Sequence, residues 1–357
     1  MRIVFVTQKV DRDHPLLGAT VAKIRALAER CDEVVVLADS VVGNDLPERC
    51  RAHEFAAQTQ VGRGARFAAA LARELARRPR PDAVVAHMCP IYAVLGALLA
   101  RPLGVRVVLW YTHWKRTPTL VAAGRLVDSI VTVDRASVPL RGSKIVPIGH
   151  GIDVSDFVSG DRAAGEEGVL NALVLGRYAA SKGIATIVEA TAIARQAGAD
   201  VRLACHGPDG TDGDAGERGR LHALVASLGL EGVVDLAGSI ARTAVPDVLR
   251  SADVLVNNTH AGSRDKVVFE ACAAGLPVLA ANPPFADLLG DVGVTLLFDR
   301  EDADGLASGL VSLAGLPSPE RRRIGAELRQ RVVERHSVES WADGLLRVCR
   351  GEANASS

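Results

Sequence analysis

The sequence has little of what marks the specialised classes of protein. Aromatic residues make up only 4% of its 357 residues, and methionine occurs twice. No run of about 18 apolar residues is present, so no transmembrane helix is expected. The six cysteines lie far apart, without a CxxC pair or a cysteine–histidine cluster at zinc spacing. A disulfide scaffold is therefore excluded, and most cysteines are expected to be small buried hydrophobes.

The chain also lacks an excess of charge of either sign. Lys and Arg together number 42 and so do Asp and Glu, so no basic field exists to hold nucleic acid, and no nucleic-acid partner is expected. The N-terminal segment MRIVFVTQKV turns polar too early for a signal peptide, which predicts a cytoplasmic protein. With 48% apolar and 24% charged residues, the composition is that of an ordinary globular protein.

Short β-branched runs alternate with longer helical patterns along the chain, which predicts parallel sheets covered by helices. The runs are nearly all apolar, as expected for strands buried on both faces of a doubly wound sheet. In the first half they cover 2–7, 33–38, 83–87, 105–112 and 129–133, with helices expected at 18–30, 62–78, 90–102 and 117–127. The second half repeats the pattern, with runs at 169–176, 201–207, 233–238, 253–258 and 276–281.

A polar, Gly- and Ala-rich stretch, VSGDRAAGEEG, separates the two series and predicts a domain boundary. We expect one Rossmann-like domain over 1–165, a second over 166–333, and a final helix over 334–350. Two such domains could face each other across a cleft. Because open α/β sheets bind ligands at the carboxyl ends of their strands, functional residues are expected directly after the strands.

The loop GRYAASKG after the run at 169–176 has the character of an anion site. Gly176 allows a close turn, Arg177 and Lys182 are cationic, and a helix begins near Gly183. The chain holds only six lysines, so Lys182 is less expected to be there by chance. The alternative is that both cations are solvated loop residues.

A second candidate follows the run at 253–258. Asp265, Lys266 and Glu270 lie on or before a helix whose other residues are mostly apolar or small. A half-buried carboxylate at Glu270 needs hydrogen-bond donors, which the two hydroxyls of a ribose would provide. The alternative is a surface carboxylate paired with Lys266 one helical turn earlier.

Other candidates rest on position alone. His113 directly follows the run at 105–112, where it could donate to a substrate hydroxyl, although a histidine at a strand end is often structural. His87 has the same position and a weaker case. Gly18 precedes a helix, but no GxGxxG pattern surrounds it, so Asp39 after the second strand is interpreted only as a strand end.

Together these segments resemble the retaining GT-B glycosyltransferases of family 4, over nearly the whole chain. The most specific part is the second domain, with LVLGRYAASKGIATIVEA, ACHGPDG, VVDLAGSIARTAVPDVLRSADVLVNN and VVFEACAAGLPVLAA in that order. IGHGIDVSDF before the linker is similar to the family's segment there. The final helix, SVESWADGLL, is similar to the one that crosses back to the first domain.

The resemblance implies that the second domain holds a nucleotide-sugar donor and the first holds an acceptor, with no metal or other cofactor. Arg177 and Lys182 match the diphosphate-binding pair, and Glu270 matches the second Glu of the Glu-x7-Glu motif, which binds the ribose. His113 is similar to the histidine near the transferred sugar. Donor contacts are further implied at Gly18, Gly176, Ile240, Asp265, Lys266 and Val267. The motif's first Glu is replaced by Gly262, so we expect Asp265 or Lys266 to contact the sugar instead.

The sequence therefore predicts a retaining glycosyltransferase that moves a hexose from a UDP- or GDP-sugar to a hydroxyl of a small-molecule, glycan or lipid-linked acceptor. Alternatives are a GT-B nucleotide-sugar epimerase or phosphorylase, or a non-catalytic sugar-nucleotide-binding paralogue. Arg73, Arg77, Arg78 and Arg80 would make a weak peripheral contact with anionic lipid if the acceptor is lipid-linked. The alternative is a solvated helix end favoured by the helix dipole.

Overall fold

The computed structural model describes residues 1–14, 17–43, 46–157, 168–210, 216–260 and 263–352. The chain forms two compact units, one made of Met1–Asp153 together with Arg335–Ser357 and the other of Val154–Glu334. The chain thus returns to the first unit near its end. The boundary predicted between residues 165 and 166 lies outside the described residues, as does Gly262.

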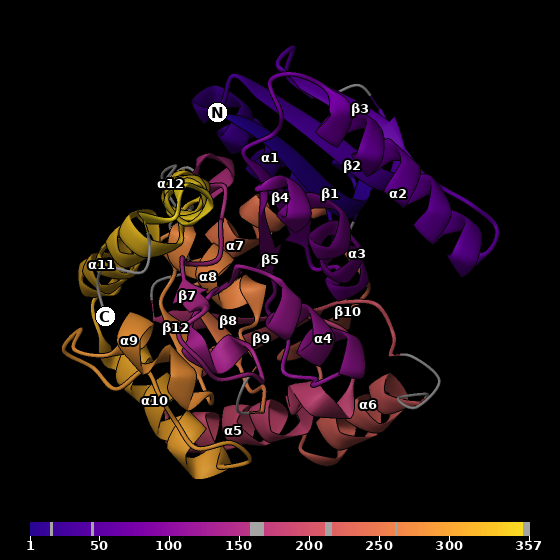
Figure 1. Ribbon diagram of the computed structural model, residues 1–357. Helices are drawn as coiled ribbons and strands as arrows, with labels where there is room; N and C mark the ends of the chain where they lie inside the picture. Colours follow the sequence, from indigo (N-terminus) through magenta and orange to yellow (C-terminus); the bar gives the residue numbers. More distant parts are fainter. Residues whose placement is uncertain (15–16, 44–45, 158–167, 211–215, 261–262, 353–357) are drawn as a thin grey trace. The chain divides into compact units, whose positions relative to one another are not determined.

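The first unit is built on a sheet of seven parallel strands (Figure 1). Their order is β3-β2-β1-β4-β5-β6-β7, so the direction of succession reverses between β1 and β4. The strands are β1 (Arg2–Val10), β2 (Glu33–Val41), β3 (Cys50–Glu54), β4 (Ala83–His87), β5 (Arg106–Trp110), β6 (Ser129–Thr132) and β7 (Ile145–Pro147). The central strands are apolar on both sides because helices cover both faces.

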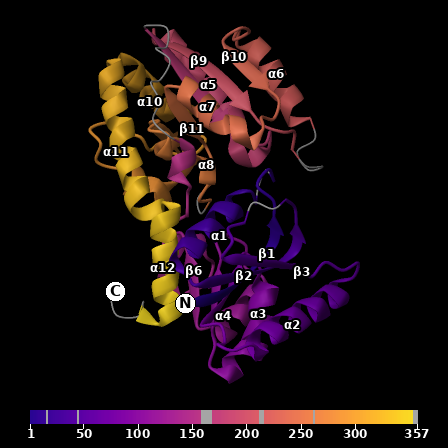
Figure 2. The same ribbon diagram turned by 90° about the horizontal axis from the view of Figure 1, so that it is seen from above.

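Two layers of helices cover this sheet (Figure 2). α1 (Ala19–Arg30) and α12 (Val338–Arg350) contact each other on one face, and α2 (Gln60–Ala76), α3 (Pro90–Ala100) and α4 (Pro118–Leu126) lie on the other. α2 begins where Thr59 Oγ1 accepts a hydrogen bond of 3.0 Å from the backbone N–H of Gly62, an N-cap. α12 packs through Trp341, whose ring lies edge-on to Trp110 with the centroids 5.7 Å apart.

The second unit has a sheet of five parallel strands in the order β10-β9-β8-β11-β12, which reverses between β8 and β11. These strands are β8 (Val169–Leu175), β9 (Asp200–His206), β10 (Val234–Ala237), β11 (Val254–Asn257) and β12 (Val278–Ala280). Right-handed crossovers place α5 (Ile184–Gln196) and α6 (Glu217–Ser227) on one face and α7 (Val245–Ser251) and α8 (Lys266–Ala273) on the other. α10 (Ala303–Gly315) contacts α5, while α9 (Ala286–Leu289) and α11 (Ser318–His336) complete the unit.

The predicted fold class, α/β with two doubly wound Rossmann-like domains, is confirmed. The predicted strands and helices lie within a few residues of the observed ones, but β3 and β7 were missed. Both lie at an edge of the first sheet. β3 reads CRAHE and is partly exposed, and β7 has only three residues. An edge strand with a solvated side does not need the apolar run that identifies a central strand.

Candidate functional site

The carboxyl ends of β8 and β11 are adjacent, at the point where the strand order of the second sheet reverses. In doubly wound sheets ligands bind at this point. The loop after β8 leads to α5 and the loop after β11 leads to α8. Asn258 Nδ2 donates a hydrogen bond of 2.9 Å to the carbonyl of Gly183, which ties the two loops together.

Both helices begin at this point without a side-chain cap within the described chain. The first N–H groups of α5 and α8 are therefore free for an anion, and the positive ends of two helix dipoles point toward it. Gly183 precedes α5 with a φ of 56°, and a Cβ there would lie 2.4 Å from Asn258 Nδ2. Only glycine allows the two loops to approach this closely.

Lys182 is not a solvated loop residue. Its ammonium contacts the carboxylate of Asp265, and both side chains are about four-fifths buried. Asn257 Nδ2 donates a second hydrogen bond, of 3.1 Å, to Asp265 Oδ2. Thr259 Oγ1 in turn donates to Asn257 Oδ1 over 2.8 Å, so Asn257 is fixed in orientation. The structure thus brings two of the predicted site residues, from different loops, into direct contact.

Arg177 lies at the start of the same loop and is exposed, and within the described residues its guanidinium has no ion-pair partner. Gly176 packs against the Lys182 side chain, because a Cβ at Gly176 would lie 3.1 Å from Lys182 Cε. The glycine therefore gives the lysine room to lie along the loop. An exposed cation and a fixed one are available beside the two helix N-termini.

Glu270 is buried, with 4% of its surface exposed. Its Oε1 lies 2.6 Å from Lys266 Nζ, the pairing that the sequence offered as an alternative, and 2.7 Å from Arg242 Nη1. Loss of hydration lowers the pKa of Lys266, while the charge of Glu270 opposes this shift and that of Arg242 adds to it. Glu270 thus contacts two cationic side chains, and carboxylate oxygens can accept further hydrogen bonds from hydroxyl groups.

Arg242 was not predicted. It lies in the short helix η6 (Arg242–Ala244), in the loop that follows β10. Ile240 lies in the same loop and is half-buried, and Val267 is buried in α8. In the sequence, Arg242 could have been noticed only because it follows a predicted strand. That position does not show which other loop it contacts, because this depends on the order of the strands in the sheet.

In the first unit, His113 lies in the loop after β5 and is exposed. Its Nδ1 accepts a hydrogen bond of 2.9 Å from the backbone N–H of Lys115. This hydrogen bond assigns the proton of the neutral ring to Nε2, which is left to donate to a ligand. The ring stacks on Trp114 with centroids 5.5 Å apart. Gly18 contacts the backbone of the loop that precedes it. Its N–H donates a hydrogen bond to the carbonyl of His14, and a Cβ at Gly18 would lie 2.4 Å from the carbonyl oxygen of Arg12.

His87 is a core residue. It is buried with its ring 5.5 Å from that of Phe5 and stacked 6.3 Å from that of Trp110. Burial lowers the pKa of His87 well below 6.5, and the charge of Lys23 lowers it further. His87 is therefore packed inside the first unit.

The sequence missed a pocket of about 610 Å³ where the strand order of the first sheet reverses, between β1 and β4. Its polar lining includes Gln8, Asp39 and Arg63, and Asp39 Oδ1 lies 3.1 Å from Arg63 Nε. Met88, at the end of β4, has a φ of 59°, a strained conformation that proteins keep mainly at functional positions. Burial raises the pKa of Tyr92 in this pocket to about 12.

Within the described residues, no group of three or more His, Cys, Asp or Glu side chains is arranged to hold a metal ion. In the same part of the chain, every helix is too short or too polar to cross a bilayer.

Comparisons with known proteins agree with this fold. Over 98% of its length the chain superposes, with a TM-score of 0.74 and 16% identity, on 99% of the Anabaena protein HepE, solved with UDP and glucose. Sucrose-phosphate synthase from Thermosynechococcus elongatus gives a TM-score of 0.74 at 18% identity, over 99% of this chain and 100% of that one. At these identities the likeness shows the fold, which is that of the GT-B proteins.

Residues 170–315 match the family described as glycosyl transferases group 1. The phosphatidyl-myo-inositol mannosyltransferase of Mycobacterium tuberculosis is 36% identical over 216 residues, which are 58% of this chain and 54% of that protein. The D-inositol 3-phosphate glycosyltransferase of Kineococcus radiotolerans is 32% identical over 239 residues, 63% of this chain and 48% of that protein. The matches span about half the length of these curated relatives. The predicted resemblance to the GT-B glycosyltransferases of family 4 is confirmed.

Proposed function

We propose that the protein is a glycosyltransferase that moves a hexose from a UDP- or GDP-sugar to an acceptor hydroxyl with retention of configuration. The observation that carries this proposal is the pair of uncapped helix N-termini beside Lys182, at the strand-order reversal of the second sheet. Two helix dipoles and a fixed cation suit a diphosphate. HepE, which shares the fold, was solved with UDP and with UDP-glucose.

In the proposed reaction Arg177 and Lys182 hold the diphosphate. As the bond from the anomeric carbon to the diphosphate oxygen breaks, they stabilise the negative charge that develops on the leaving phosphate. The acceptor oxygen bonds to the anomeric carbon on the same face, and its proton passes to the departing phosphate. Because these cations meet the charge directly, we propose that no metal is required, and activity is expected to persist in EDTA.

In this proposal Glu270 accepts hydrogen bonds from the two ribose hydroxyls. His113 donates a hydrogen bond from Nε2 to a hydroxyl of the transferred sugar. Asp265 or Lys266 binds the sugar in place of the first motif Glu. If Asp265→Ala and Lys266→Ala each left turnover and donor affinity intact, this part of the proposal would be wrong.

The acceptor is proposed to bind the first unit, in the pocket between the carboxyl ends of β1 and β4. Relatives named for phosphatidyl-myo-inositol and for D-inositol 3-phosphate support a polyol hydroxyl, free or lipid-linked. A cytoplasmic location and weak peripheral contact with anionic lipid through Arg73, Arg77, Arg78 and Arg80 belong to the same proposal. Flotation with phosphatidylcholine vesicles, with and without phosphatidylglycerol, tests the contact.

Thermal stabilisation by ligands tests the donor site, because a ligand that binds the native state raises its stability by mass action. The panel consists of UDP, GDP, ADP, dTDP, NAD and the matching nucleotide sugars. We expect one diphosphate to raise the Tm, and expect Arg177→Ala and Glu270→Ala to remove that rise. Arg220→Ala, which changes an exposed arginine on α6, is the matched control.

The outcome also separates the rival functions. If no nucleotide sugar stabilises the protein, a non-catalytic paralogue without a working donor site is favoured, in keeping with Gly262 at the motif position. If one does, product analysis decides the reaction. An epimerase converts the nucleotide sugar without an acceptor, a phosphorylase requires inorganic phosphate, and a glycosyltransferase requires an acceptor hydroxyl.

A further inference from the structure

A cavity of about 780 Å³ lies at the amino ends of the strands of the first sheet. Its walls come from the starts of β1, β2 and β5, the segment after α2, and the end of α12. It is therefore at the opposite edge of the sheet from His113 and from the pocket between β1 and β4. The charged lining consists of Arg2, Arg77, Arg78, Arg80, Arg106 and Arg350 against Asp32, Glu33 and Asp82.

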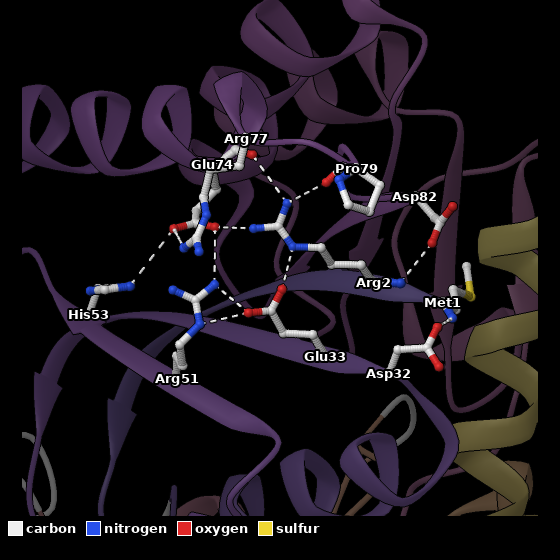
Figure 3. A network of polar contacts seen from close by, with 10 residues as sticks. All are labelled: Met1, Arg2, Asp32, Glu33, Arg51, His53, Glu74, Arg77, Pro79 and Asp82. Atoms are coloured by element: carbon white, nitrogen blue, oxygen red, sulfur yellow. Dashed lines mark hydrogen bonds and ion pairs between the residues drawn. The ribbon is translucent and has the colours of Figure 1, made fainter.

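A buried network fixes one wall of this cavity (Figure 3). Arg2 is almost fully buried, and its guanidinium contacts the carboxylates of Glu33 and Glu74. Its Nη1 also donates to the carbonyl of Pro79 over 2.8 Å. Arg51 contacts the same two carboxylates from β3. The network neutralises Glu33 and Glu74 internally and holds the backbone of 77–80 in place.

Arg77 also contacts Glu74, but three other arginines of the lining are poorly neutralised. Within the described residues Arg80 and Arg106 have no ion-pair partner, and the only carboxylate near Arg350 is that of Glu352, at 4.0 Å. Arg106 Nε is buried and has no hydrogen-bond partner in the described part of the chain. A buried N–H without an acceptor is costly, and the Arg106 side chain that carries it lines the cavity.

Helix dipoles do not account for this set of cations. α2 and α12 end at the cavity, and a cation near each C-terminus is favourable. Arg106 begins a strand, however, and Arg80 lies four residues beyond the end of α2, where the dipole has little effect. The excess of guanidinium groups around a cavity of ligand size needs another explanation.

We propose that this cavity binds a phosphate-bearing ligand, whose oxygens receive paired hydrogen bonds from Arg80 and Arg106. Guanidinium groups match the geometry of phosphate oxygens and donate charge-assisted hydrogen bonds. The ligand is either a soluble phosphomonoester or diphosphate or the headgroup of an anionic lipid. The site is separate from the donor and acceptor sites proposed above, although Arg77, Arg78 and Arg80 also belong to the proposed lipid contact.

Calorimetric titration of the full chain with inorganic pyrophosphate tests the proposal. The titration uses the double variant Arg177→Ala/Lys182→Ala, so that the diphosphate loop of the second unit does not contribute. We expect this protein to bind pyrophosphate still. Adding Arg80→Gln or Arg106→Gln should weaken that binding at least about tenfold, the loss expected for one charge-assisted hydrogen bond.

The matched control is Arg125→Gln, which removes an exposed arginine on α4 outside the cavity and should leave binding unchanged. Arg80→Lys, which keeps the charge, should retain more affinity than Arg80→Gln. Unchanged Tm values show that the variants are folded. Arg80 is exposed, so Arg80→Gln is expected to fold and tests the proposal even if Arg106→Gln unfolds.

Vesicles of phosphatidylcholine with phosphatidylglycerol form the second arm. If the vesicles but not pyrophosphate bind in a manner that depends on Arg80 and Arg106, the ligand is a lipid headgroup, and the reverse result identifies a soluble phosphate. If both probes bind Arg80→Gln and Arg106→Gln as they bind the parent, the proposal is wrong. It is equally wrong if Arg125→Gln weakens binding as much as Arg80→Gln does.

Discussion

The ammonium of Lys182 contacts the carboxylate of Asp265, which also accepts a hydrogen bond of 3.1 Å from Asn257. The lysine that the sequence assigns to a diphosphate is therefore already paired with an anion of the same unit. A diphosphate at this loop has to displace that carboxylate or accept its repulsion. Four consequences of the described geometry can be tested.

Asp265→Asn is expected to tighten UDP binding about tenfold, because the amide no longer competes for the Lys182 ammonium. Transfer from the nucleotide sugar should slow at the same time if Asp265 contacts the sugar. Calorimetry gives the first quantity and initial rates give the second. Asp235→Asn, an exposed change on β10, is the control. Weaker UDP binding by Asp265→Asn would show that the diphosphate does not displace the Asp265 carboxylate from Lys182.

Gly183→Ala is expected to destabilise the second unit by about 2 kcal/mol or more and to abolish nucleotide binding. The new methyl would overlap Asn258 Nδ2 and take a left-handed backbone conformation. Gly198→Ala also has a positive φ, 94°, but nothing lies within 4 Å of its Cβ, so it isolates the backbone strain. Equal losses of stability in the two variants, measured by urea unfolding, would show that the loop contact does not matter.

Trp341→Ala is expected to lower the free energy of unfolding of the first unit by about 3–5 kcal/mol, because it leaves a large cavity beside Trp110. Trp114→Ala removes an indole that is 56% exposed and should cost less than about 0.5 kcal/mol. Denaturant unfolding, followed by circular dichroism, measures both. A small effect of Trp341→Ala would mean that α12 is not needed for the first sheet.

His87 makes stability depend on pH. Burial keeps the pKa of His87 well below 6.5 in the folded protein, whereas the unfolded chain takes up the proton near 6.5. As the pH falls below that value, the unfolded state gains the proton first, so the free energy of unfolding decreases by up to about 1.4 kcal/mol per pH unit. His87→Phe should lose this part of the slope between pH 7 and 5. A slope identical to that of the parent would assign the effect to other groups.

The sequence was sufficient for the central strands and for the loops that follow them. The runs that begin at Ala83 and at Val169 are apolar because helices cover both faces, and this pattern is visible without a structure. The loop carrying Lys182 and the helix carrying Glu270 were identified because each directly follows such a run.

What the sequence could not supply was the order of the strands. Arg242 follows β10 and meets Glu270 of α8 although two strands separate β10 from β11 in the sheet, and Asp39 of β2 meets Arg63 of α2. Asp39 was interpreted as a strand end because no GxGxxG pattern precedes it, whereas β2 continues to Val41. The φ of 59° at Met88 could not be predicted from the sequence, because methionine is not a residue type that favours positive φ. Sites built from two distant loops need the topology before they can be recognised.

The return of the chain to the first unit has a consequence for biosynthesis. α1 and α12 cover the same face of the first sheet, and α12 spans Val338–Arg350. A ribosome must therefore complete the whole second unit before that face can be closed over Trp110. Until then the nascent first unit exposes apolar surface, and this stage of synthesis is when chaperones and aggregation compete for the protein.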